Sequence, residues 1–217
     1  MNEPIFLRHN KIDLALHSLR SGTGRPLLIL HGLGDHIRPE CPEWASAWPG
    51  PVYGLDFTGH GRSTVPVGGG YTAEVLMGDV DAALAHLGPC TLVGFGLGGY
   101  IALLLAGARP KLVRGAIIAD GTGISGGPSA PSTSLMITSV IRQGRAPDAW
   151  ALVELARDPR PADYALQLVH QAALLSGLDD PIAVCARFRP PWLAAAADHP
   201  AVLVTDLATA LSTFASS

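Results

Sequence analysis

Charge is scarce in this chain, and the scarcity limits what it can bind. Only 15% of the 217 residues are Asp, Glu, Lys or Arg, and the formal net charge is −3. Without a basic excess there is no electrostatic reason to expect a nucleic acid or an anionic membrane surface as partner. Hydrophobic residues make up 48% of the chain, which predicts one compact domain with a large buried core.

Membrane and export signals are also missing. No apolar run approaches the roughly 20 residues that span a bilayer, and residues 1–4 have neither a basic region nor an apolar signal core. These absences predict a cytoplasmic protein without a membrane partner. The expected partner is a small-molecule ligand, and a homodimer is compatible with the sequence.

Metal-binding and cofactor-binding patterns are absent as well. The three cysteines, Cys41, Cys90 and Cys185, form no C-x-x-C pair and are expected to be reduced thiols. The eight histidines are scattered without H-x-x-x-H spacing, and no G-x-x-x-x-G-K-[ST] phosphate loop occurs. We therefore expect neither a metal nor a cofactor.

Strand-like and helix-like segments alternate through the first 120 residues. This order predicts an α/β fold, with a mostly parallel central sheet flanked by helices. A strand pair is expected around Asn10 and Lys11, within Phe6–Leu19. The other expected strands are 27–30, 52–56, 90–93 and 113–119, and the expected helices are 42–48, 71–87 (N-cap Thr72) and 97–108.

The stretch Val93-Gly94-Phe95-Gly96-Leu97-Gly98-Gly99-Tyr100 joins an expected strand to an expected helix. Small residues on both sides of one position allow the sharp strand–turn–helix arrangement known as a nucleophile elbow. In the G-x-S-x-G pattern the middle position carries the nucleophile, and here that position is Gly96. The turn is therefore predicted without the atom that would attack a substrate.

Two further loops follow expected strands. His31-Gly32-Leu33-Gly34 can turn backbone N–H groups inward, where such groups stabilise negative charge on an oxygen. The second loop, residues 57–63, is dense in glycine and hydrogen-bonding side chains. We expect Asp56, Arg62 and Ser63 to brace this loop, and we rate His60 as a weaker candidate for a base.

These three motifs, in this order and spacing, resemble the α/β-hydrolase superfamily in its epoxide hydrolase, haloperoxidase and esterase style. The resemblance covers about the first 120 residues. It implies that Leu33 and Leu97 supply the backbone N–H groups of an oxyanion hole. It also implies three regions within one structural domain: a core over residues 1–120, a helical lid over 121–177, and remaining core helices with a candidate last strand over 178–217.

The chain departs from the family pattern at each member of the catalytic triad. Gly96 stands where the family places Ser, Asp or Cys. The family's histidine follows the last strand, whereas the last histidine here is His199. The acid after a late strand has candidates in Asp198 and Asp206, neither in a convincing setting. Asp120, at the end of the strand after the elbow helix, is the carboxylate best placed to face the pocket.

The late segments are expected to be mostly helical, in a shortened C-terminal part. Helices are predicted over 132–143, 148–157, 162–175 and 181–188, and 201–205 is the candidate last strand.

Three functions remain open from the sequence. The first is a binding protein that holds a small, largely apolar ligand with a carbonyl or carboxylate oxygen. Its ligand-binding residues would be the two motifs His31, Gly32, Leu33, Gly34 and Phe95, Gly96, Leu97. The second is an atypical hydrolase or lyase that uses a bound water, with Asp120 as base helped by His36 or His60.

The third function is a protein-interaction module with Trp150, Tyr164 and Trp192 as aromatic anchors. A rival interpretation of the elbow is a dinucleotide fingerprint, G-x-G-x-x-G, with glycines at 94, 96 and 99. A fingerprint of that kind normally opens the first βαβ unit, whereas this one follows several strands, so the hydrolase interpretation is favoured.

Overall fold

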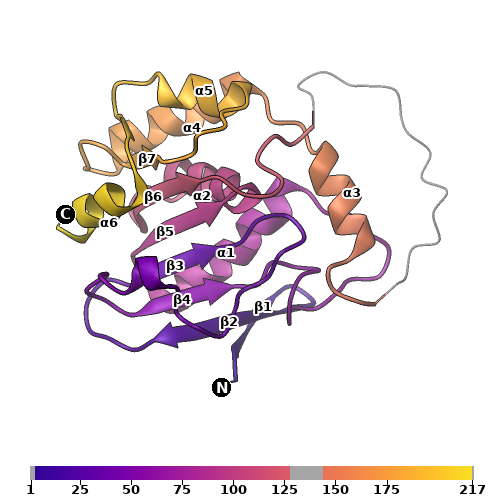
Figure 1. Cartoon of the computed structure of the whole chain (residues 1–217). Helices are drawn as coiled ribbons and strands as arrows, with labels where there is room; N and C mark the ends of the chain where they lie inside the picture. Colours follow the sequence, from indigo (N-terminus) through magenta and orange to yellow (C-terminus); the bar gives the residue numbers. More distant parts are fainter. Residues whose placement is uncertain (1–2, 128–143, 217) are drawn as a thin grey trace.

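An eight-stranded sheet runs through the whole molecule (Figure 1). The computed structural model describes residues 3–127 and 144–216. The strand order is β1-β2-β4-β3-β5-β6-β7-β8; β1 and β2 are antiparallel to their neighbours, and the strands from β4 to β8 are parallel. The strands are β1 Ile5–His9, β2 Ile12–Arg20, β3 Leu27–Leu30, β4 Val52–Leu55, β5 Cys90–Phe95, β6 Val113–Ala119, β7 Ile182–Val184 and β8 Val202–Val204. The predicted α/β fold with a mostly parallel sheet is confirmed.

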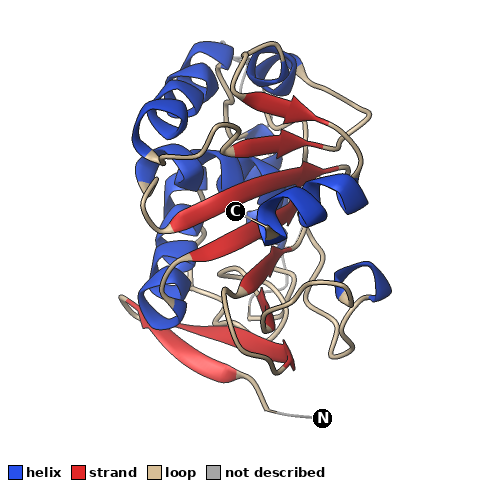
Figure 2. Cartoon of the chain, turned by 90° about the vertical axis from the view of Figure 1, so that its left-hand side faces the viewer, coloured by secondary structure: helices blue, strands red, loops and turns tan. Residues whose placement is uncertain are grey.

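The helices cover the two faces of the sheet unequally. Figure 2 shows a nearly continuous helical layer on one face and sparser, shorter helices on the other. The thick layer holds α1, α2, α4 and α5, and the thin side holds η1 and α6. The helices are η1 Glu43–Ala45, α1 Ala73–Leu87, α2 Leu97–Ala108, α3 Ala149–Arg157, α4 Ala162–Leu175, α5 Pro191–Ala197 and α6 Leu207–Ala215.

Local sequence signals explain most of these elements. The strand pair predicted around Asn10 forms, and Asn10 itself adopts a positive φ of 54°, as a tight turn requires. The Thr72 side chain caps α1 by accepting a hydrogen bond from the Val75 N–H, as predicted. The helix expected over 42–48 is reduced to the single 3₁₀ turn η1.

The later part of the chain contains more strand than expected. Helices are confirmed within 148–157 and 162–175, and β8 confirms the candidate strand over 201–205. The helix predicted over 181–188 is wrong, because Ile182–Val184 forms β7 beside β6. All three residues of β7 are buried, so the strand lacks the alternating pattern that marks a half-exposed strand. The helix predicted over 132–143 lies outside the described residues.

The region expected to form a lid, 121–177, is divided between two places. Figure 1 places α4 beside α2 in the thick helical layer, whereas α3 lies to one side of it. The α3 segment is bonded to the residues that precede α1, since Asp148 accepts a hydrogen bond from the Tyr71 hydroxyl and Glu154 accepts from the Tyr71 N–H. A covering role for this region remains a prediction. No helix among the described residues is long and apolar enough to cross a membrane.

The packing of α4 on α2 depends on one glycine. A Cβ added at Gly107 would lie 2.5 Å from the Leu168 carbonyl oxygen. In a free helix Ala is favoured over Gly by about 1 kcal/mol. We predict that Gly107→Ala nevertheless lowers the free energy of unfolding, by about 1–3 kcal/mol, because the added methyl group overpacks this contact. Urea denaturation measures the change. A variant more stable than the wild type would contradict the prediction, because it would show that α4 moves to accommodate the methyl group without loss of stability.

Candidate functional site

The site forms where two loops leave neighbouring strands. β3 and β5 are paired and parallel, so the loop after Leu30 and the elbow after Phe95 emerge at the same edge of the sheet. The chain continues from β3 to β4 on one side and from β5 to β6 on the other, which makes this edge the switch point where ligands bind in open α/β sheets. Gly96 has φ 57° and ψ −114° and begins α2. The predicted elbow therefore forms, and no side chain projects from it.

The two N–H groups expected to form an oxyanion hole converge on one oxygen atom. The Leu33 N–H and the Leu97 N–H each donate to the Thr122 carbonyl oxygen, at 3.0 Å. The Thr122 hydroxyl in turn donates to the Leu33 carbonyl oxygen at 2.7 Å. The chain's own backbone thus occupies the position that the sequence predicted for a substrate oxygen.

Glycines make this close approach possible. A Cβ added at Gly96 would overlap the Thr122 carbonyl oxygen, and one at Gly32 would lie 2.5 Å from the Thr122 hydroxyl oxygen. A Cβ at Gly121 would lie 2.6 Å from the Gly96 nitrogen. The bare elbow and the segment that fills the oxyanion position are therefore sterically matched.

A buried arginine, Arg160, holds the segment that follows Thr122. The Arg160 Nη1 donates to the carbonyl oxygens of Gly123 and Ile124, at 2.6 and 2.7 Å, and the Trp192 Nε1 donates to the second of these at 2.9 Å. The guanidinium lies 4.6 Å from the centre of the Tyr100 ring. Burial lowers the pKa of Arg160 to about 10, so the side chain stays charged at neutral pH.

Two buried histidines hold the oxyanion loop and act as bracing groups. His31 bonds the Gly32 carbonyl oxygen through Nδ1, and its Nε2 accepts from the Phe57 N–H. His60 accepts from the Gly34 N–H through Nε2 and bonds the Thr58 carbonyl oxygen through Nδ1. Burial lowers the pKa of both, that of His31 to about 4, so both rings are neutral at pH 7. With both ring nitrogens engaged, neither histidine has a free lone pair for catalysis.

Asp56 and Ser63 brace the loop of residues 57–63 as predicted, whereas Arg62 takes part only through its backbone N–H and its guanidinium lies over the Phe6 ring. The Asp56 carboxylate accepts from the N–H groups of Ile37 and Arg62, at 2.7 and 2.9 Å, and lies 2.9 Å from His17 Nε2. Burial alone would raise the pKa of Asp56, but these hydrogen bonds lower it below its ordinary value. The Ser63 hydroxyl donates to the Asp56 carbonyl oxygen.

The two residues predicted to be catalytic have different surroundings. Asp120 is exposed at the end of β6, and its carboxylate accepts from the N–H groups of Arg187 and Phe188 at 3.0–3.1 Å. It therefore braces the loop after β7. His36 is exposed, beside Asp35 at 3.8 Å.

The family resemblance predicts an acid after a late strand and a histidine after the last strand. The residues after β7 are Cys185 and Ala186, and those after β8 are Thr205 and Asp206. Asp206 caps α6 by accepting from the Thr209 N–H. His199 precedes β8, so it lies at the opposite edge of the sheet from the elbow.

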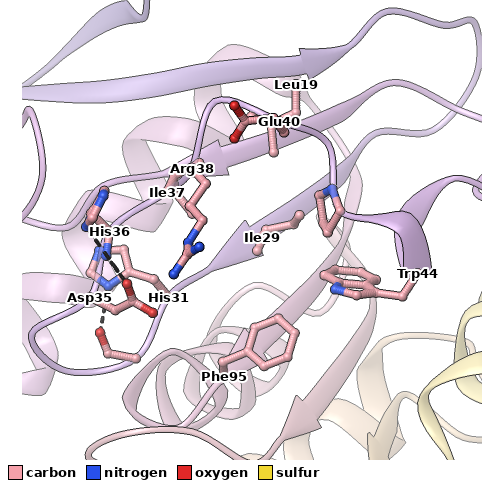
Figure 3. Close-up of a pocket in the computed structure, with 12 residues that line it drawn as sticks. Leu19, Ile29, His31, Asp35, His36, Ile37, Arg38, Glu40, Trp44 and Phe95 are labelled. Carbon is pink, nitrogen blue, oxygen red and sulfur yellow. Dashed lines mark hydrogen bonds and ion pairs between the residues drawn. The ribbon is translucent and has the colours of Figure 1, made fainter.

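A cavity of about 350 Å³ opens beside the elbow, on the thin side of the sheet (Figure 3). We call it the Phe95 cavity. Four of the residues predicted to bind or react line it: His31, Gly32, His36 and Phe95. Leu33, Gly34, Gly96 and Leu97 do not line it. The remaining lining residues are Leu19, Ile29, Asp35, Ile37, Arg38, Glu40, Pro42 and Trp44.

The sequence reasoning missed Arg38 and Trp44 because, beyond His36, the segment 35–48 was expected only to connect elements and to form a short helix over 42–48. In the structure this segment is mostly irregular and covers the sheet face with a single 3₁₀ turn. Among residues 3–127 and 144–216, no group of three His, Cys, Asp or Glu side chains could hold a metal ion.

We predict that Gly96→Ser destabilises the protein, by about 2 kcal/mol or more, because its Cβ would displace the Thr122 carbonyl from the Leu33 and Leu97 N–H groups. Gly88→Ser is the matched control, since Gly88 also has a positive φ, of 76°, but its Cβ would have no neighbour within 4 Å. Urea midpoints compare the two variants. Equal losses would show that backbone strain, and not overlap with Thr122, explains the effect.

Stability is predicted to fall in acid because His31 is buried neutral. Between pH 6.5 and pH 4 the unfolded chain binds a proton at this residue and the folded chain does not. At 1.36 kcal/mol per pKa unit, His31 accounts for a loss of about 3 kcal/mol between pH 7 and pH 4. The urea midpoint of His31→Gln should fall less steeply over this range. Parallel curves for the two proteins would contradict the prediction.

Comparison with known proteins gives the same picture as the fold. Lipase LipV of Mycobacterium tuberculosis is 31% identical over 180 residues, which cover 75% of this chain and 64% of that protein. Epoxide hydrolase 4 of Mus musculus is 31% identical over 121 residues, which cover 52% of this chain and 33% of that protein. The chain thus spans less than two thirds of either relative.

A solved structure agrees over nearly the whole length. The thioesterase domain from the curacin biosynthetic pathway superposes with a TM-score of 0.67 at 17% identity, covering 99% of this chain and 97% of that one. At that identity the likeness concerns the fold alone. Residues 25–198 match the profile of the α/β hydrolase fold family. The chain therefore belongs to the α/β hydrolase fold family.

Proposed function

We propose that this protein binds a small, largely apolar ligand with a carbonyl or carboxylate oxygen and does not turn it over through a covalent intermediate. One observation carries the proposal. The Thr122 carbonyl oxygen accepts hydrogen bonds from both N–H groups of the predicted oxyanion hole, next to an elbow whose central residue, Gly96, has no side chain. An acyl-enzyme needs a nucleophile at that elbow and an open oxyanion position. Gly96 and Thr122 remove both requirements.

The expected loss of turnover rate supports binding over hydrolysis. Removing the nucleophile or the base of a triad costs on the order of a million-fold in turnover. The remaining rate, roughly 10³-fold over water, depends on an accessible oxyanion hole. In this chain the hole is filled by Thr122, so even that residual contribution is blocked while residues 121–124 stay in place.

The Phe95 cavity is the place we propose for the ligand. Its volume of about 350 Å³ lies at the small end of the range for ligand pockets, roughly 300–1,000 Å³. The Trp44 and Phe95 rings, whose centres are 5.6 Å apart, form an aromatic wall, and both side chains are only partly buried. A flat apolar ligand would cover exposed aromatic surface here, which is a favourable change.

The alternatives have less support. A hydrolase or lyase with a bound water and Asp120 as base would need a carboxylate free to take a proton, and this one is engaged by two backbone N–H groups. A protein-interaction module would need exposed aromatic anchors. Of the three predicted anchors, Trp192 is 1% exposed and packs on Tyr100, so it belongs to the core, Trp150 is partly buried, and Tyr164 alone is exposed, at 36%.

The absence of covalent turnover is tested directly. We expect no hydrolysis of short-chain or aromatic p-nitrophenyl esters above the rate in buffer, and no labelling by a fluorophosphonate probe. An active serine esterase in the same assay serves as the positive control. Turnover that survives purification of the chain to homogeneity and disappears in Asp120→Asn would support the water mechanism and contradict the proposal.

Ligand binding is tested with 2-acetylnaphthalene, a flat ketone. Binding should quench the fluorescence of Trp44 and raise the thermal midpoint. Trp44→Phe should remove most of the quenching while calorimetry still detects binding. Phe95→Ala should weaken binding about tenfold through lost contact area. Met77→Ala, in a different cavity beside α1 and α2, is the control. Absence of binding to the wild type, or equal losses in the two alanine variants, would contradict the site.

A further inference from the structure

We propose that Arg38 binds a carboxylate group of the ligand, so that the Phe95 cavity selects a small aromatic carboxylate over a neutral molecule of the same shape. This inference rests on the proposed function and narrows its ligand from a carbonyl or carboxylate to a carboxylate. Figure 3 shows the Arg38 guanidinium reaching into the middle of the cavity, with Ile29 and Phe95 on one side and His36 on the other.

The charge of Arg38 is not paired with any other group in the part of the chain that the structure describes. The side chain makes no hydrogen bond or ion pair with any described residue. By contrast, Arg20 donates to backbone carbonyl oxygens of the segment 45–50, and Arg8 pairs with Asp13 at 2.6 Å. Arg38 is exposed, so its N–H groups face solvent and are available to an incoming anion.

The acidic residues around the cavity do not neutralise this cation. Asp35 accepts from the His36 N–H and lies 3.8 Å from the His36 ring nitrogen. Glu40 lies at the Leu19 end of the cavity, away from the aromatic wall (Figure 3). Neither carboxylate forms an ion pair with Arg38. The nearby His31 ring is neutral and adds no competing positive charge.

The guanidinium and the aromatic wall together define the ligand class. A guanidinium presents its N–H groups in a planar fork that matches the two oxygens of a carboxylate. The aromatic wall of Trp44 and Phe95 accepts a flat ring. The cavity volume restricts the ligand to one small ring system. A fused bicyclic carboxylate is therefore the appropriate first probe.

Three probes of the same shape test the proposal: naphthalene-2-carboxylate, naphthalene-2-carboxamide and 2-naphthylmethylammonium. At low ionic strength the wild type should bind the carboxylate about tenfold more tightly than the carboxamide, as expected for a hydrogen bond to a charged group. The ammonium compound should bind most weakly. Arg38→Gln should make the carboxylate no tighter than the carboxamide and leave carboxamide binding unchanged.

Arg62→Gln is the matched control. Arg62 lines the neighbouring cavity of about 570 Å³, which contains neither Trp44 nor Phe95. The substitution therefore removes one positive charge nearby, as Arg38→Gln does, and leaves the aromatic wall unchanged. This variant should keep the wild-type preference. Equal binding of carboxylate and carboxamide, tightest binding of the ammonium compound, or equal effects of the two glutamine variants would overturn the role of Arg38.

The outcomes separate this inference from the function on which it rests. Equal binding of carboxylate and carboxamide by the wild type, with both weakened in Phe95→Ala, would overturn the selection by Arg38 and leave the binding function standing. Failure of all three probes to bind would overturn the proposed function and the carboxylate site together.

Discussion

The contact between the Thr122 carbonyl oxygen and the N–H groups of Leu33 and Leu97 governs the structure around the elbow. Each N–H belongs to a different loop, and the oxygen belongs to a third. One atom therefore ties together the ends of three strands, β3, β5 and β6. The contact requires the third loop to reach the elbow, and this is possible only because Gly96 leaves the space empty.

The same region shows how buried polar groups hold the loops around the elbow. In this chain His31, His60 and Asp56 are all buried, and each of them satisfies backbone N–H or carbonyl groups of the surrounding loops. Arg160 does so for the segment that carries Thr122. Polar groups in a dry interior must be paired, and these pairings keep the loops at fixed positions. The rigid frame that results supports the wall of the neighbouring cavity.

The unequal cover of the sheet explains where a ligand can lie. One face carries a helical layer built on α2, which is buried along nearly its whole length. On the other face, the irregular segment 35–48 and α6 cover the strands more thinly. Close packing of side chains needs regular, complementary surfaces, and an irregular segment does not provide one. The Phe95 cavity is the consequence, and it brings Arg38 and Trp44 to the strands that end at the elbow.

Local sequence determined the fold class, the elbow and the oxyanion loop, because glycine spacing and buried strand runs act over a few residues. It also determined that Gly96 cannot attack a substrate, since that follows from the residue alone. The strand β7 was missed because three residues buried on both faces carry no periodic signal. Only the tertiary structure showed that Thr122 fills the oxyanion position, 25 residues beyond Leu97 and 89 beyond Leu33 in the chain. Contacts between such distant backbone atoms depend on how the strands pair, and no local pattern of side chains encodes them.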